Sequence, residues 1–567
     1  MNNATKRTLA AATAFLIVAT AASRVLGLVR EIIQVYYLGL GPQMGAFTAA
    51  QKLPNLIRAL LADTALSAAF IPIFSGLLEK DKRREAWQAA YTVSVMVAVI
   101  LGFVTLLGVI FAPQVVKLVA PGFGKHPELI PLTVSLTRIM FPQLIALGLA
   151  GIAMGILNSY NQFSIPAIAP IVWNVIIIVS LIVFSFITGY TTSQGLIKNS
   201  GFEILAWATF LGTVAQLLIQ LPAVWKRRWR EAGERLRLNF RDPALRQMGL
   251  ILGPVMISLG IINFNALVDT QFASYLGDGS AVGWIDKAFR LFQLPQGVFA
   301  IAIGTVLFPA LSRHAAGNRL KEFKKDLSLG IRQIFFLTLP FVAFFIVLAV
   351  PTVRLIYQHG REVDSQQIAS VASALTFFSV GMAFVSVNTL LNRAFYSIRK
   401  SWWPLVTGVV NLGLNALLDW AFYKRLGVGG ITLSTSLVSL FNFFGLAVLL
   451  RRNIGSIDEL RILRSFARAI AALIPLAGVS YGVWWGLDHV LGRTNPAQIV
   501  SVGAAYILGA GAYFLAGRAM RMEEARDIIG VILRRRNRGR SSDGGTTGGG
   551  TGGGGTTGAL PEGGDSA

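Results

Sequence analysis

Arginine and lysine side chains occur inside stretches of this sequence that are otherwise apolar enough to cross a membrane. Arg24 and Arg30 lie in the first of these stretches. Three more cations follow in later stretches, namely Lys52, Arg58 and Arg290. A charge near the centre of a bilayer costs about 2.5–3.5 kcal/mol even on the lenient insertion scale, and arginine does not escape that cost by losing its proton. Several cations in neighbouring helices therefore predict a polar cavity that faces an anion.

The spacing of these residues predicts which of them lie on the same face of a helix. Glu31 follows Arg24 by seven positions, so both share a helix face, whereas Arg30 is turned away from Arg24 by about a third of a turn. We expect Glu31 to hold an arginine in position between substrates. Arginine pairs bidentately with phosphate oxygens, which makes a diphosphate the natural ligand. The candidate site also includes Asn55 as a ligand contact and Ser23 and Asp63 as gate or charge partners.

A structural alternative is that these cations lie near helix ends and extend their head groups to the membrane surface. That explanation suits Arg58 or Lys52 taken singly. It suits Arg24 poorly, because Arg24 lies near the middle of its apolar stretch. Charges inside membrane segments are by default functional, so the cluster as a whole favours a binding site.

A second polar group has the opposite charge. Asn415 and Asp419 are four positions apart and share a helix face, and Asp269 lies in an earlier apolar segment. Thr435 supplies a further oxygen. Oxygen donors around two carboxylates suit a hard monovalent cation or a proton. On the residues alone, a structural pair between an aspartate and a base such as Lys424 explains the pattern equally well.

The composition indicates a membrane protein. Of the 567 residues, 54% are apolar and only 14% are charged, and repeated apolar runs of about 20 residues indicate transmembrane helices. The net charge of +24 would suggest nucleic acid in a soluble protein. Here most of the excess lies in short loops, where it indicates topology and attraction to an anionic leaflet, so no nucleic-acid partner is expected. The sequence has no cysteine, which excludes disulfides, thiol nucleophiles and cysteine–metal sites.

The apolar runs predict an all-α polytopic fold with fourteen transmembrane helices. The expected spans are about 8–38, 43–77, 87–115, 129–157, 164–189, 203–225, 246–276, 284–312, 329–357, 366–397, 402–424, 428–450, 466–491 and 497–519. Lysine and arginine concentrate in alternate loops, which places both termini in the cytoplasm. A signal peptide ending near Ala21 is the alternative for the first run, but the apolar pattern continues to about Leu40.

Similar spacings of proline and threonine in the second and eighth spans predict an internal repeat. Thr64 follows Pro54 by ten positions, as Thr305 follows Pro295. We infer two pseudo-symmetric six-helix lobes, and internal repeats place transporter sites at the interface between halves. The predicted parts are an N-terminal lobe at 1–230, a C-terminal lobe at 245–455, two extra helices at 460–520, and a disordered Gly/Thr-rich cytoplasmic tail at 541–567.

Several short motifs are spread from the first span to about residue 450. They are Ser23–Glu31, Lys52–Arg58, Ala68–Pro72, Ala120–Phe123, Leu157–Ala167, Arg290–Gly297 and Gly304–Pro309. At these spacings they resemble the MurJ (MviN) family of lipid II flippases. The resemblance implies the fold of the multidrug/oligosaccharidyl-lipid/polysaccharide exporter superfamily, with two six-helix lobes around a central cavity. It also implies that the two extra helices border a groove for the polyprenyl tail.

The resemblance implies a function as well. A protein of this kind moves lipid II, the undecaprenyl-diphosphate-linked peptidoglycan precursor, from the inner to the outer leaflet of the bacterial cytoplasmic membrane by alternating access. The family's cavity arginines match Arg24, Arg30, Arg58 and Arg290, and its sodium site resembles Asp269, Asn415, Asp419 and Thr435. No other cofactor is implied, and the membrane potential is expected to help reset an arginine-rich cavity, since one charge is worth about 2.3 kcal/mol per 100 mV. The expected partners of this monomer are lipid II, membrane lipids and, through the tail, cytoplasmic cell-wall regulators.

Three places depart from the family pattern. Gly45 and Phe289 stand where other members have acidic residues. Residues 399–404, with their adjacent Trp402 and Trp403, replace the family's usual turn. These departures leave open which groups pair with the arginines and how the cytoplasmic gate is built.

Other functions explain parts of the sequence. A cation-coupled drug antiporter of the same superfamily predicts a cavity of carboxylates and aromatics, which the five cations argue against. A flippase for another polyprenyl-diphosphate-linked glycan fits the cations equally well. A non-transporting scaffold predicts that residues 541–567 matter more than Arg24. An enzyme fits least, because no acid–base pair, metal set or nucleophile stands out, and the nucleophile-like Gly478–Gly482 lies in an apolar span with no strand before it.

Overall fold

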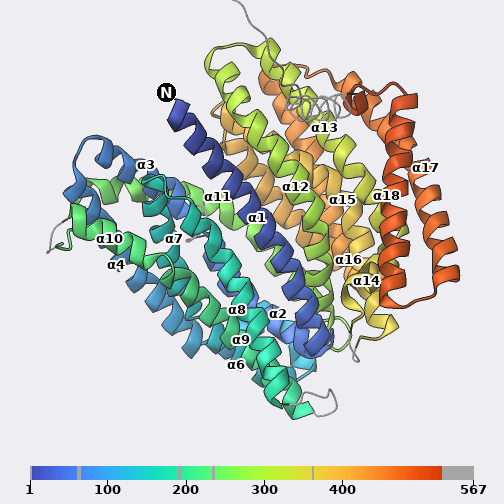
Figure 1. Ribbon diagram of the computed structural model, residues 1–567, viewed down its shortest axis with the longest axis horizontal. Coiled ribbons are helices and arrows are strands. Elements are labelled where there is room, and N and C mark those ends of the chain that lie inside the picture. Colours follow the sequence, from blue (N-terminus) through green and yellow to red (C-terminus); the bar gives the residue numbers. More distant parts are fainter. Residues whose placement is uncertain (1–2, 61–64, 189–194, 233–235, 360–362, 527–567) are drawn as a thin grey trace, which may run out of the picture.

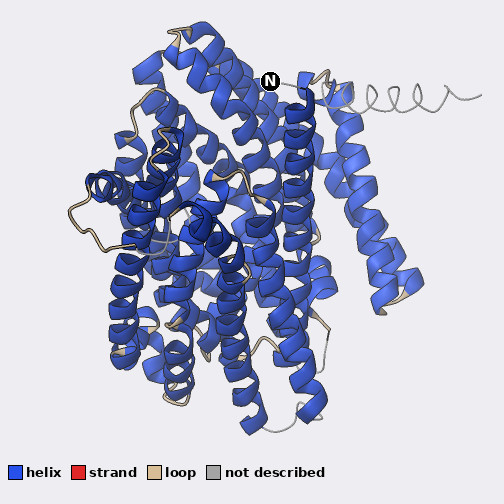
Figure 2. Ribbon diagram, turned by 60° about the vertical axis from the view of Figure 1, so that its left-hand side comes forward, coloured by secondary structure: helices blue, strands red, loops and turns tan. Residues whose placement is uncertain are grey.

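The computed structural model describes residues 3–526, apart from 61–64, 189–194, 233–235 and 360–362. All regular secondary structure in this part of the chain is helical, as Figure 2 shows. Ten of the described helices are long and apolar enough to cross a membrane. The prediction of an all-helical polytopic membrane fold is therefore confirmed. Asp63 and the tail at 541–567 lie outside the described residues.

The N-terminal helices form one group, on the left of Figure 1. They are α1 (Asn3–Leu38), α2 (Pro42–Arg58), α3 (Ala65–Glu79), α4 (Arg83–Ile110), α5 (Ala112–Val119), the 3₁₀ helix η2 (Pro121–Lys125), α6 (Leu129–Met140), α7 (Gln143–Ser159), α8 (Ser164–Thr188), α9 (Gly195–Leu218) and α10 (Leu221–Glu231). Helix α8 packs between α1 and α9, and α7 packs on α3 and α4. Helices α6 and α7 are separated at Phe141 and Pro142, where proline has no backbone N–H to continue the ladder.

The later helices form the second group, on the right of Figure 1. They are α11 (Pro243–Ser274), α12 (Ala281–Ala316), α13 (Leu320–Val347), α14 (Ala349–Tyr357), α15 (Ser365–Ser397), α16 (Trp402–Ile454), α17 (Glu459–Leu491) and α18 (Asn495–Ala519). Helix α15 packs against α12, α13 and α16, while α17 and α18 pair with each other. This pair forms the outer edge of the group and is held to it chiefly through α13.

Helix α16 is continuous by hydrogen bonding, but it is too long to be one straight rod in a membrane. Its 53 residues would extend about 80 Å, against about 30 Å of hydrocarbon. Gly427 breaks it, with φ of +56° and ψ of −133°. Glycine adopts positive φ without the steric cost that a Cβ imposes, so two helices meet at this residue.

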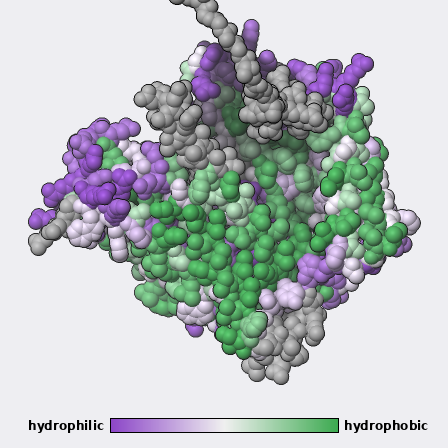
Figure 3. Space-filling view, in the orientation of Figure 1, coloured by the Kyte–Doolittle hydropathy of each residue, from purple (hydrophilic) through white to green (hydrophobic). Residues whose placement is uncertain are grey.

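The surface is suited to lipid. Figure 3 shows apolar side chains across the middle of the visible face, with hydrophilic residues gathered towards the upper corners. Large apolar side chains such as Phe186 and Val490 are more than 80% exposed, at 89% and 81%. An apolar surface of this extent belongs in a hydrocarbon environment rather than in water.

The two groups of helices meet along a seam. Helix α12 packs on α2, and α11 packs on both α2 and α3. Helix α1 crosses between the groups in Figure 1. The seam therefore brings charged residues of α1, α2 and α12 into one region, although they are far apart in the sequence.

Candidate functional site

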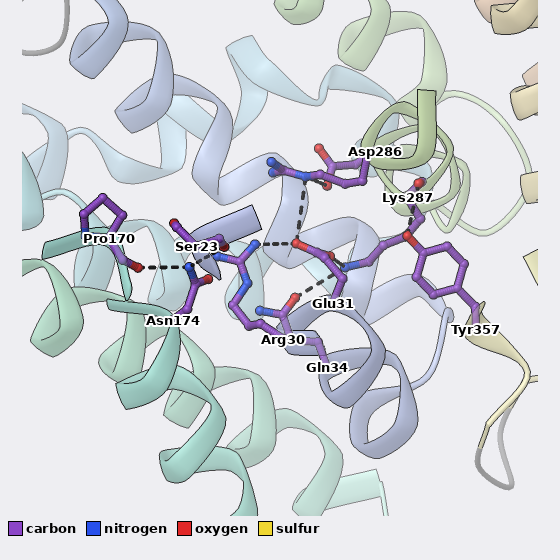
Figure 4. Close-up of polar contacts among 10 residues, drawn as sticks. Ser23, Arg30, Glu31, Gln34, Pro170, Asn174, Asp286, Lys287 and Tyr357 are labelled. Atoms are coloured by element: carbon purple, nitrogen blue, oxygen red, sulfur yellow. Dashed lines mark hydrogen bonds and ion pairs between the residues drawn. The ribbon is translucent and has the colours of Figure 1, made fainter. Parts of the chain in front are cut away.

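Cations from two helices converge on Glu31, which is 5% exposed. Arg30 Nη2 donates to Glu31 Oε1 at 2.5 Å, and Lys287 Nζ donates to the other carboxylate oxygen (Figure 4). Arg290 Nε lies 3.9 Å from Glu31 Oε1. Burying a carboxylate costs several kcal/mol unless it is paired, and here three cations compensate its charge.

A second carboxylate, Asp286, extends this group along α12. Its Oδ2 lies 3.5 Å from Nε of Arg290, one turn later in the same helix. Its Oδ1 lies 3.8 Å from Nζ of Lys52, which comes from α2. We call these six residues, Glu31, Arg30, Lys287, Arg290, Asp286 and Lys52, the Glu31 cluster. It contains four cations and two carboxylates, so it keeps an excess of positive charge.

Polar and aromatic neighbours hold the cluster in place. Lys287 also donates to Gln34 Oε1 at 3.3 Å, and Tyr357 donates to the Lys287 carbonyl at 3.2 Å. The Arg30 guanidinium lies 4.5 Å from the ring centroid of Trp173, within the range of a cation–π contact. Arg30 Nε is buried and has no hydrogen-bond partner among the described residues. The N–H at Arg30 Nε is therefore a donor that remains available to a ligand.

Three cavities adjoin the cluster. One of about 430 Å³ opens among the N-terminal helices and is lined by Arg30, Asn55 and Arg58. A second, of about 210 Å³, lies between α2, α11 and α12. A third, of about 450 Å³, follows α1 and α12 and is lined by Arg24. Among the described residues, Arg290 lines all three and is therefore at their junction.

The remaining predicted residues lie around these cavities. Ser23 lines the first cavity, and its carbonyl accepts a 3.5 Å hydrogen bond from Asn174. Arg24 projects over Gly297 of α12, where an added Cβ would lie 2.7 Å from Nη1. The absence of a side chain at Gly297 thus provides the space for that guanidinium. Among the described residues, the arginines that pair with the Glu31 carboxylate are Arg30 and Arg290 rather than Arg24.

The structure supplies physical reasons for two of the departures from the family pattern. A Cβ at Gly45 would lie 2.1 Å from the carbonyl oxygen of Gly279, so an acidic side chain does not fit there. Phe289 packs among aromatic rings, with its centroid 5.7 Å from that of Phe378. The carboxylate beside Arg290 is provided instead by Asp286, one turn earlier in α12.

Sequence reasoning missed Asp286, Lys287, Gln34 and Trp173. The rule that selected Arg290 also applies to Asp286 and Lys287, because both are charged residues in the same apolar helix. Both lie near the start of the expected span 284–312, where charges are easily solvated and so give a weaker signal. Trp173 and Gln34 carry no signal of their own in the sequence, since their roles depend on packing between helices.

The second predicted group comes together between α11 and the two parts of α16. Asn415 Nδ2 donates to Asp269 Oδ1 at 2.7 Å and to Asp419 Oδ2 at 3.1 Å. Thr435 Oγ1 lies 3.4 Å from Asp269 Oδ2. We call these four residues the Asp269 cluster. In the described part of the chain no ion pair joins Lys424 to an aspartate, and Lys424 Nζ lies 5.8 Å from the ring centroid of Tyr423.

The Asp269 cluster has unused acceptors. The Oδ1 atoms of Asn415 and Asp419 are buried and have no hydrogen-bond partner among the described residues. Buried oxygens are normally satisfied, and oxygen atoms without donors are the ligands that hard cations prefer. No group of three or more His, Cys, Asp or Glu suited to a metal ion occurs among the described residues. The unused oxygens beside two carboxylates suit a hard monovalent cation or a proton.

The sequence also matches a known protein family. The family model for lipid II flippase MurJ matches residues 34–495. The chain belongs to the MurJ lipid II flippase family. The lipid II flippase MurJ of Burkholderia cenocepacia is 29% identical over 500 residues, which cover 87% of this chain and 94% of that protein. The resemblance predicted from the motifs is thereby confirmed.

Solved structures agree on the fold. A lipid II flippase MurJ in an inward closed conformation superposes with a TM-score of 0.68 at 21% identity, covering 88% of this chain and 98% of that chain. An inward-facing multidrug resistance MATE transporter of the MOP superfamily gives a TM-score of 0.62 at 16% identity, covering 77% and 96%. The MurJ family consists of multi-pass transporters of the bacterial cytoplasmic membrane and not of enzymes.

Proposed function

We propose that this chain flips lipid II from the inner to the outer leaflet of the cytoplasmic membrane for cell-wall synthesis, and that the Glu31 cluster binds the diphosphate of the lipid. The observation that carries the proposal is the excess of cations where the three cavities meet at Arg290. Membership of the MurJ family supports the choice of lipid II as the cargo.

The roles of the cations follow from their positions. Arg290 and Arg30 are the principal phosphate ligands, because Arg290 faces all three cavities that adjoin the cluster and the N–H at Arg30 Nε is an unused donor. Arg24 and Arg58 contact the diphosphate from the third and first cavities. Glu31 holds the cations together while no substrate is bound, since like charges in a buried site repel one another. When the diphosphate binds, bidentate pairs between arginine and phosphate oxygens then replace some of the ion pairs with Glu31.

The broken helices suggest how the chain crosses the membrane. In this proposal α2 with α3, α6 with α7, and α9 with α10 each form one interrupted span, and α16 forms two spans joined at Gly427. The count is then fourteen, with both termini in the cytoplasm, two six-helix lobes at 1–230 and 245–455, and α17 and α18 beside the lipid tail. Rocking of one lobe against the other would move the headgroup across.

The Asp269 cluster is the proposed sodium site. Asp269 and Asp419 would supply the negative charge, and Asn415 and Thr435 would supply neutral oxygens. The unused acceptors on Asn415 and Asp419 support this assignment. A bound sodium ion would add one positive charge to a region that otherwise carries two carboxylates, and the membrane potential would act on that charge during resetting.

The proposal is tested in cells whose growth depends on this protein. Arg30→Ala, Arg24→Ala, Arg290→Ala and the charge reversal Arg290→Glu are each expected to stop growth and to lower the amount of lipid II exposed outside. Arg313→Ala is the matched control, because Arg313 is an exposed arginine near the cytoplasmic end of the same helix, α12. Normal growth with normal lipid II exposure in the first four variants would contradict the proposal.

A further inference from the structure

Lys52 belongs to the Glu31 cluster, but it is held more loosely than the other lysine of the cluster, Lys287. Its only ion pair among the described residues is with Asp286, at 3.8 Å between Nζ and Oδ1. That separation exceeds the roughly 3.2 Å limit of a good hydrogen bond. By contrast, Lys287 is fixed by hydrogen bonds to both Glu31 and Gln34. The ammonium of Lys52 is therefore less restrained than that of Lys287.

Lys52 also faces the other cluster. The cavity of about 210 Å³ between α2, α11 and α12 is lined by Lys52, Asp286 and Arg290, and on its other side by Asp269 and Thr435. Asp286 pairs with Lys52 at 3.8 Å, and Asp269 lines the same cavity as Lys52. A lysine ammonium is a compact charge on a flexible four-carbon stem. One mobile cation thus shares a small space with a carboxylate of each cluster.

We propose that Lys52 couples cation binding at the Asp269 cluster to diphosphate binding at the Glu31 cluster. A cation held by Asp269 repels the Lys52 ammonium towards Asp286. Lys52 then neutralises Asp286, whose other partner is Arg290 at 3.5 Å. The guanidinium of Arg290 is released from that carboxylate and becomes available to phosphate oxygens. The inference rests on the proposed function, because it assumes that Arg290 binds the diphosphate.

The sign of the coupling follows from this order of events. Cation binding raises the affinity for the diphosphate, and by linkage diphosphate binding raises the affinity for the cation by the same factor. Without a bound cation, Lys52 is shared between Asp286 and Asp269 and acts as a tethered competitor for the cation site. Removing the ammonium is therefore expected to tighten cation binding while abolishing the coupling.

The experiment uses the purified full chain in nanodiscs. The affinity for lipid II is measured in sodium chloride and in potassium chloride of equal ionic strength, and the sodium-dependent shift in melting temperature is measured in parallel. For the wild type we expect sodium to raise the affinity for lipid II by about fivefold or more. For Lys52→Gln we expect a sodium-dependent melting shift at lower sodium concentration, and the same affinity for lipid II in both salts.

Two further variants keep the test decisive. Lys82→Gln removes an exposed lysine that also pairs with a carboxylate, Glu85, and is expected to keep the wild-type ratio of affinities. Asp286→Asn removes the carboxylate that restrains Arg290, and it is expected to bind lipid II with the higher affinity in either salt. The Asp286 variant tests the same link if Lys52→Gln does not fold.

The possible failures are distinguishable. A wild-type ratio of affinities in Lys52→Gln or in Asp286→Asn would overturn the coupling while leaving the proposed function intact. Absence of lipid II binding by the wild type would overturn the proposed function itself. Lipid II binding by the wild type with no effect of sodium on affinity or melting temperature would overturn the coupling together with the sodium site.

Discussion

The Glu31 cluster and a group around Arg332 are both assemblies of opposite charges, but they differ in charge balance. In the second group, Arg332 Nη1 lies 2.6 Å from Glu524 and 3.0 Å from Glu523, and Arg461 Nη2 lies 2.6 Å from Glu523. We call these four residues the Arg332 cluster. Its two arginines face two glutamates, whereas the Glu31 cluster has four cations for two carboxylates.

The difference separates a structural role from a ligand-binding role. The Arg332 cluster joins α13 and α17 to the segment that follows α18, and its two arginines and two glutamates form hydrogen bonds with one another. The Glu31 cluster lies where three cavities meet and leaves positive charge uncompensated. The Asp269 cluster has the reverse imbalance, with two carboxylates and no basic residue hydrogen-bonded to them among the described residues. Imbalance of charge, rather than burial alone, is what points to a ligand.

The largest expected effect comes from removing the central carboxylate. Glu31→Gln leaves Arg30, Lys287 and Arg290 without their shared counter-charge, and breaking a buried ion pair in this way costs about 3–5 kcal/mol. The free energy of unfolding in detergent measures it. Gln34→Ala is the matched control, because it removes only a neutral acceptor of Lys287 and is expected to cost about 1 kcal/mol. Equal stability of Glu31→Gln and wild type would mean that the cluster does not depend on its carboxylate.

The next largest effect is stabilisation by a bound anion, which we expect to depend on the Glu31 cluster and not on the Arg332 cluster. Inorganic pyrophosphate at 100 times its dissociation constant is expected to stabilise the wild type by about 2.7 kcal/mol. Arg290→Ala is expected to lose most of that stabilisation, because Arg290 is at the junction of the cavities. Arg332→Ala is expected to lower the free energy of unfolding without pyrophosphate, but pyrophosphate is expected to stabilise this variant as much as it stabilises the wild type. A pyrophosphate increment that disappears in Arg332→Ala and persists in Arg290→Ala would reverse the assignment of roles.

The sequence predicts the parts of this arrangement that are local. Apolar runs predict the helices, because the bilayer requires about 20 apolar residues from each span irrespective of its neighbours. The charges in those runs predict a polar site, because their cost in lipid is also local. Asn415 and Asp419 share a face by helical spacing alone, and the structure joins them at 3.1 Å.

The pairing within the clusters is not local, and the sequence does not predict it. Lys287 and Glu31 are 256 positions apart and meet because side chains of α1 and α12 reach each other where the two groups of helices join. Arg30 was expected to turn away from the face that carries Arg24 and Glu31, yet its long side chain reaches back to the neighbouring carboxylate at 2.5 Å. The absence of an acid at Gly45 is explained by the Gly279 backbone, which comes from another part of the chain.

A smaller loss of stability, in Glu524→Gln, tests the structural role of the Arg332 cluster. Glu524 accepts hydrogen bonds from Arg332 at 2.6 Å and from Ser465 at 3.1 Å. Glu524→Gln is expected to cost about 1.5–3 kcal/mol of unfolding free energy, the range for hydrogen bonds to charged groups. Lipid II flipping in proteoliposomes is expected to stay at the wild-type rate at a temperature where the variant is folded. A loss of flipping by folded Glu524→Gln would show that this cluster takes part in transport.

The smallest expected effect is the pH dependence of the same cluster, at Glu523. Hydrogen bonds from Arg461 hold the pKa of Glu523 below its ordinary value. A folded-state pKa below the unfolded value contributes stability that is present above the unfolded pKa, about 4.3 for glutamate, and is lost as the pH falls through the folded-state pKa. Because Glu523 is 45% exposed, this contribution is limited to about 0.2–1 kcal/mol.

The melting temperatures of wild type and Glu523→Gln measure that contribution. They are expected to differ slightly at about pH 7, and the difference is expected to shrink as the pH falls below about 4.3 and through the lowered folded-state pKa of Glu523. The Glu31 cluster provides the contrast, because Glu31→Gln is expected to be less stable than wild type throughout this range. A difference between Glu523→Gln and wild type that stays constant down to about pH 3 would mean that the charge of Glu523 contributes nothing. In that case the Arg332–Glu524 pair alone would hold the segment after α18 to α13.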